Sequence, residues 1–97
     1  MKDQEIRELV KDLESVGLSD DPSTIEVGRD GVTNIGYAGN DSDVEIIFLL
    51  KRSSYESISL WNNHCYFVSQ RNSYTIVCDS EESAKRVAKK IQTFLNS

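Results

Sequence analysis

Alternating apolar and polar residues dominate the middle of the chain, over residues 43–79. Such alternation is typical of strands that bury one face of a sheet. Short polar turns interrupt the pattern, and two of them fall at Asn62-Asn63 and Arg71-Asn72. Turns of two or three residues join antiparallel strands, so this stretch predicts a run of strands linked by hairpins.

The turns also predict which residues lie opposite each other, because the position of a turn fixes the register of its strands. Turns at 52–54, 62–63 and 71–72 would align the apolar residues of one face in two rows across the sheet. Aligned cross-strand neighbours of this kind stabilise a sheet. The two predicted rows are Phe48, Ile58, Phe67 and Ile76, and Ile46, Leu60, Cys65 and Cys78.

A further hairpin is predicted over residues 24–37. A three-residue loop ending at Gly31 would place Ile25 opposite Ile35 and Val27 opposite Thr33. A two-residue turn ending at the same glycine would place Ile25 opposite Gly36, which is a poorer match of side chains. The three-residue loop is therefore the predicted arrangement.

Two segments outside the predicted sheet show helical periodicity. Residues 3–16 carry an apolar stripe and are followed by Gly17, a residue that commonly ends a helix. The second helix is predicted to begin with Asp79 as its N-cap and Glu82 as the capping-box partner. The predicted stripes are Ile6, Leu9, Val10, Leu13 and Val16 in the first helix, and Ala84, Val87, Ala88, Ile91, Phe94 and Leu95 in the second.

The predicted fold is therefore α+β, with an N-terminal helix, a five-stranded, mainly antiparallel meander sheet and a C-terminal helix. A length of 97 residues is that of one domain, which we assign to residues 1–97. No apolar run approaches the roughly 20 residues that a membrane helix needs, and no secretory signal is recognisable. We therefore expect a cytoplasmic protein that makes no contact with a membrane.

The net charge of −5 is unevenly distributed along the chain. Residues 1–50 carry 12 acidic and 4 basic side chains, whereas residues 51–97 carry 4 acidic and 7 basic ones. A protein that binds nucleic acid directly usually has a basic stripe, so we expect no direct nucleic-acid contact. The acidic half leaves one alternative open. This is an inhibitor of the nucleic-acid-mimic type, as found in phages and mobile elements, that blocks a cationic site on another protein.

Few residues are candidates for chemistry. Cys65 and Cys78 could hold a metal, but zinc sites usually need four ligands and the chain has a single histidine. We interpret both cysteines as reduced, buried thiols. His64 would lie opposite Asp79 and beside Trp61, which suggests a general base, but neighbouring Cys65 would point to the other face of the sheet. We therefore expect no catalytic residue, no metal and no cofactor.

The face of the predicted sheet that points away from those rows is unusually apolar. A solvent-facing antiparallel sheet normally alternates to polar residues, and a contiguous exposed apolar patch usually marks an interaction site. A helix on each face would cover the patch, whereas two helices on one face would leave it open. The latter arrangement predicts a non-enzymatic interaction module that binds a protein partner, or a second copy of itself, through Ile47, Leu49, Trp61, Tyr66 and Val68.

Overall fold

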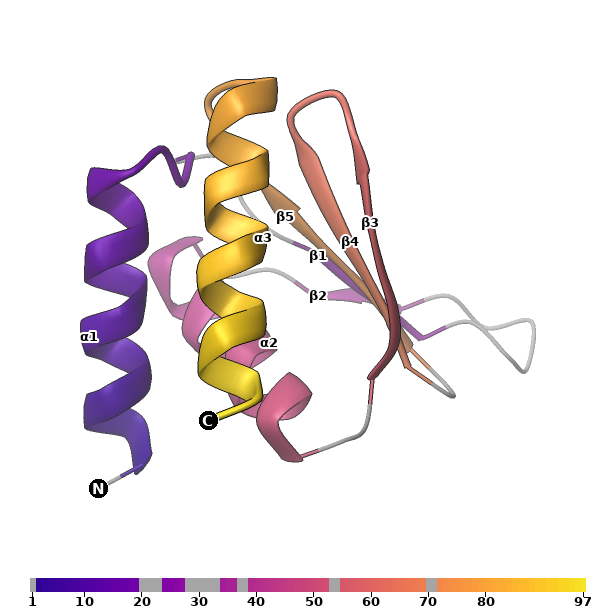
Figure 1. Cartoon of the computed structure of the whole chain (residues 1–97). Coiled ribbons are helices and arrows are strands. Elements are labelled where there is room, and N and C mark those ends of the chain that lie inside the picture. Colours follow the sequence, from indigo (N-terminus) through magenta and orange to yellow (C-terminus); the bar gives the residue numbers. More distant parts are fainter. Residues whose placement is uncertain (1, 20–23, 28–33, 37–38, 53–54, 70–71) are drawn as a thin grey trace.

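Three helices lie on one side of an antiparallel sheet in the computed structural model (Figure 1), which describes residues 2–19, 24–27, 34–36, 39–52, 55–69 and 72–97. The predicted α+β class is thereby confirmed. In chain order, the elements are α1 (Lys2–Ser15), β1 (Thr24–Val27), β2 (Asn34–Gly36), α2 (Gly39–Arg52), β3 (Tyr55–Trp61), β4 (His64–Ser69), β5 (Asn72–Val77) and α3 (Glu81–Leu95).

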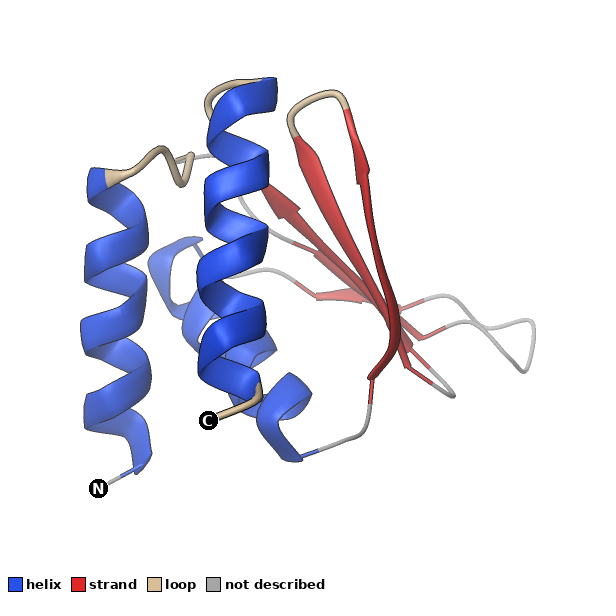
Figure 2. Ribbon diagram, in the orientation of Figure 1, coloured by secondary structure: helices blue, strands red, loops and turns tan. Residues whose placement is uncertain are grey.

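The sheet has the strand order β2-β1-β5-β4-β3, and all four neighbouring pairs are antiparallel. Strands β3, β4 and β5 form a continuous meander, and β1 and β2 extend it beyond β5. Helix α3 packs over β4 and β3, whereas α1 packs against α2. In Figure 2 all three helices lie on the same side of the sheet, and α1 is the helix farthest from it.

The strand predicted over residues 43–50 is wrong, because this segment belongs to helix α2. From Asp43 onward, the buried positions of α2 are Asp43, Ile46, Ile47 and Leu50, which follow the i, i+3, i+4, i+7 spacing of a helix face. The run from Val44 to Leu50 is apolar at almost every position, so it fits strand and helix periodicity alike. Ile46 and Phe48 therefore do not join the predicted cross-strand rows.

The two predicted registers of the meander have different outcomes. Pairing of Ile58 with Phe67 across β3 and β4 is confirmed, and Asn62 in the connecting turn has a positive φ of 53°. The predicted register of β4 against β5 is wrong by two residues, because Phe67 lies opposite Tyr74 and Cys65 opposite Ile76. A shift of two residues leaves every side chain on its face, so burial alone does not distinguish these registers.

The first hairpin adopts the register with the poorer match of side chains. Ile25 lies opposite Gly36, so the predicted pairing of Ile25 with Ile35 is wrong. The connecting loop itself lies outside the described residues. Strand β1 also pairs with β5 on its other side, where Ile25 lies opposite Tyr74. The register of β1 must therefore fit both β2 and β5, whereas the prediction from the hairpin sequence considered β2 alone.

The predicted apolar stripes of the two terminal helices are confirmed. Ile6, Val10 and Leu13 of α1 are buried, as are Ala84, Val87, Ala88 and Ile91 of α3. The remaining members, Leu9, Val16, Phe94 and Leu95, are partly buried against the same core.

The N-cap of α3 is Ser80 and not the predicted Asp79. The Ser80 hydroxyl accepts a hydrogen bond from the backbone N–H of Ser83 at 3.1 Å. Both residue types are good caps, so the sequence does not separate them. The structure does, because the backbone N–H of Asp79 donates to the carbonyl of Gly17 at 2.8 Å, which keeps Asp79 in the connection between β5 and α3.

Gly17 follows α1 in the chain and lies beside the start of α3. Its φ of +117° confirms the left-handed conformation predicted for this position, and a Cβ added here would clash with the side chain of Ser83. Leu18 then forms a bridge with Cys78. This segment thus brings three elements together at one end of the molecule.

We expect Gly17→Ala to destabilise the protein by about 1–3 kcal/mol, since alanine is strained at this φ and its Cβ meets Ser83. Urea denaturation measures the loss. The same substitution in a Ser83→Gly background separates the steric part from the backbone part, because glycine removes both the Oγ and the Cβ that the added methyl group would meet. A stability equal to that of the wild type would contradict the observed conformation of Gly17.

Phe67 and Val68 offer a matched pair of substitutions on the two faces of β4. Phe67 is fully buried beneath the helices, so Phe67→Ala should cost about 3–5 kcal/mol. Val68 lies on the opposite face and is only partly buried, so Val68→Ala should cost much less. Urea denaturation of both variants tests this, and equal small losses would show that the inner face was misassigned.

Candidate functional site

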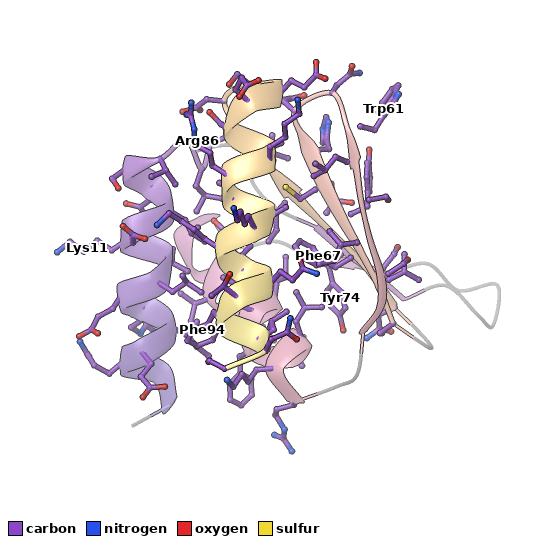
Figure 3. All side chains as sticks on the ribbon, in the orientation of Figure 1. Lys11, Trp61, Phe67, Tyr74, Arg86 and Phe94 are labelled. Carbon is purple, nitrogen blue, oxygen red and sulfur yellow. The ribbon has the colours of Figure 1, made fainter. Side chains whose placement is uncertain are left out.

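The side of the sheet that faces away from the helices is the candidate site. Along β4 and β5, Cys65, Phe67, Tyr74 and Ile76 are buried, and the residues between them are partly accessible. Figure 3 shows Phe67 and Tyr74 directed toward the helices, and Trp61 on the side of the sheet away from the helices. We call this second face the open face, because no described element packs on it.

Three rings form a row along the open face near its edge. Trp61 and His64 lie opposite each other across the turn between β3 and β4, with ring centroids 6.5 Å apart and planes 27° apart. His64 stacks in turn on Tyr66 at 5.9 Å and 20°. Trp61, His64 and Tyr66 are the aromatic row, and Trp61 is its most accessible member at 64% exposure.

Small polar residues and valines surround the aromatic row. Tyr66 lies between Ser59 and Thr75, and Val68 lies between Ser57 and Ser73. None of the residues that β3, β4 and β5 place on the open face from position 57 onwards is acidic or carries a permanent positive charge. The part of the open face that β3, β4 and β5 form is thus a mixture of aromatic, aliphatic and hydroxyl groups.

The structure brings together only part of the predicted site. Trp61, Tyr66 and Val68 share the open face, but the placement of Ile47 and Leu49 beside them is wrong. Both belong to α2 on the other side of the sheet, where Ile47 is fully buried and Leu49 is half-buried. The error follows directly from treating residues 43–50 as a strand.

His64 belongs to the site for a reason that differs from the predicted one. Val77 lies opposite it and not Asp79, so the suggested His–Asp pair does not form. Its Nδ1 atom is buried and has no hydrogen-bond partner among the described residues. The signal for its stacking role is the spacing of Trp61, His64 and Tyr66 around a two-residue turn, which puts all three rings on one face.

The two cysteines lie in the core, with their sulfur atoms 3.9 Å apart and not bonded. The Sγ of Cys65 also donates to the carbonyl of Ala84 at 3.2 Å. The hydrogen bond between the thiols lowers the pKa of Cys65 and raises that of Cys78, and burial raises both. Cys65 is therefore the thiol that ionises first, but it is fully buried.

Within the described ranges, no group of three or more potential metal ligands occurs. No helix in that part of the chain is long and apolar enough to cross a membrane. No family model, curated protein or solved structure matches the chain.

We expect both cysteines to react slowly with a thiol reagent in the folded protein and rapidly in urea. Burial excludes the reagent, although the pKa of Cys65 is lowered. Serine at both positions should leave partner binding intact. Labelling of native protein at the rate seen in urea, or stoichiometric zinc in the purified protein, would contradict this prediction.

Proposed function

We propose that the protein is a non-enzymatic interaction module that binds another protein through its open face. One observation carries the proposal. Trp61 is 64% exposed and continues into a stacked row of rings on a face that no described element covers. Exposed contiguous apolar groups usually mark interaction sites, and aromatic side chains dominate the energetics of interfaces.

The chemistry of the open face favours a protein partner over a nucleic acid. Binding to a phosphate backbone relies on lysine and arginine, and the described positions of this face carry neither. Rigid aromatic rings among small hydroxyl residues instead resemble surfaces that bind proteins, where rings supply contact area and hydroxyls adapt their hydrogen bonds. Trp61 and Tyr66 are the expected anchors, with Val68 completing the contact.

The acidic-inhibitor alternative receives less support from the arrangement of charges. On α1, exposed Arg7 and Lys11 are interspersed among the exposed carboxylates. Asp12 also forms an ion pair with Lys90 of α3 at 3.0 Å, so its charge is already matched. Salt separates the two hypotheses. An apolar interface tolerates salt, whereas a complex held by charge mimicry weakens steeply with ionic strength.

The decisive variant is the double substitution Tyr66→Lys, Val68→Lys. Two lysines on the open face should prevent docking, because each buries a charge without a partner. We expect a protein that co-purifies with the wild type from cell extract to be lost, and its affinity in purified form to fall at least 100-fold.

The control is Gln92→Lys, Thr93→Lys, which adds the same charge at exposed positions of α3. It should bind like the wild type. Circular dichroism must show that both variants are folded. If the open-face variant is folded and still binds with full affinity, the open face is not the docking surface. If it unfolds, the face was part of the core and the proposal fails.

A further inference from the structure

Strand β3 lies at one edge of the sheet, with β4 on one side and no described strand on the other. Its regular part runs from Ser57 to Trp61, beyond an irregularity between Tyr55 and Ser57. Proline and charged residues commonly protect edge strands from pairing with other chains. This regular part of β3 contains neither. No residue of this regular part therefore opposes pairing with a strand of another chain.

Exposed apolar area is concentrated on this strand. Leu60 and Trp61, exposed by 43% and 64%, are the exposed large hydrophobic residues of the described part of the chain. Because they are consecutive in a strand, they point to opposite faces of the sheet. A partner lying on one face would cover only one of them. A strand added at the edge of β3 would bring side chains against both.

The unpaired backbone groups of β3 can be identified. Across a two-residue turn, the closing pair Trp61 and His64 is hydrogen-bonded, and such pairs alternate along antiparallel strands. The alternation agrees with the next pair of strands, where the backbone N–H of Cys78 donates to the carbonyl of Asn63 at 2.8 Å. It follows that the N–H and C=O groups of Ile58 and Leu60 point outward from the sheet.

We propose that two copies of the chain pair through β3 in an antiparallel arrangement, around a two-fold axis that passes at Ser59. This register pairs Ile58 with Leu60 of the second copy, so that the outward backbone groups satisfy one another. It also places the exposed Leu60 beside an isoleucine on the helix side of the sheet. On the open face, Trp61 covers Ser57 of the second copy, and small serines meet at the axis.

Other positions of the axis fit less well. An axis at Leu60 would pair Ile58 with Asn62, a turn residue with positive φ. An axis at Ile58 would bring the irregular region before Ser57 into the ladder. The axis at Ser59 uses all five regular residues and no others. Such an isologous contact is the commonest form of a homodimer.

The contact is small, so the dimer should be weak and concentration-dependent. A regular overlap of five residues with two large apolar side chains from each copy lies at the low end of stable interfaces. Each copy carries a net charge of −5, so the two copies repel each other. Raising the ionic strength screens this repulsion and should strengthen the dimer. The edge dimer does not depend on the proposed function, because its pairing uses the edge of β3 and leaves Tyr66 and Val68 of both copies accessible on the same side of the sheet.

The register is tested with Ser59→Lys and Ser59→Glu in sedimentation velocity experiments over a wide range of protein concentration. Ser59 is exposed, so neither variant should disturb the folded monomer. Like charges meet at the axis in each homodimer, and each variant should therefore be monomeric where the wild type dimerises. An equimolar mixture of the two should restore a dimer. A wild type that stays monomeric throughout, or a mixture that does not dimerise, overturns the proposal.

A backbone test uses Leu60→Pro with Leu60→Ala as its control. Proline removes an N–H that points outward, so the pairing with β4 and the fold should persist. We expect Leu60→Pro to lose the dimer and Leu60→Ala to weaken it less. The Tyr66→Lys, Val68→Lys variant should still dimerise through the edge. A dimer that is lost in this variant but kept in Ser59→Lys lies on the open face and overturns edge pairing.

Discussion

The fold depends on the burial of one face of the β3–β5 meander beneath α3. Phe67 and Ile76 of the sheet are fully buried in the core, and α3 packs on this surface with the small residues Ala84 and Ala88. Small side chains let a helix approach a sheet closely, and the approach is close enough for the Cys65 thiol to donate to the Ala84 carbonyl. Residues of α1 and α2 complete the same core, which therefore joins all three helices to the inner face of the sheet.

The helices add a second layer on the same side of the sheet. Helix α1 packs on α2, and its Asp12 reaches Lys90 of α3. The carbonyl of Gly17 accepts a hydrogen bond from the N–H of Asp79, which holds the C-terminal end of α1 beside the start of α3. One face of the sheet therefore lies under two helical layers, while the open face has no described cover. This asymmetry, more than any single residue, makes the open face the candidate interaction surface.

The sequence predicted the elements whose signals are local. The helix stripes of α1 and α3 repeat with the helical period, and Asn62-Asn63 marks a hairpin turn, so these features were predicted correctly. Residues 43–50 were not, because a nearly continuous apolar run has no distinct period. The β4–β5 register was wrong by two residues, yet the face assignment of Phe67 survived because strand periodicity is two.

The candidate site was predictable only where these local signals were correct. Trp61, Tyr66 and Val68 follow from the hairpin, whereas Ile47 and Leu49 were misplaced with the false strand. Strand order is a non-local property, and the sequence does not report that β1 lies beside β5. A strand at 43–50 would have paired with the outer side of β3 and made it an interior strand. Because that segment is a helix, β3 becomes an edge, and the side chain of Leu60 and the outward backbone groups beside it are left for another chain to meet.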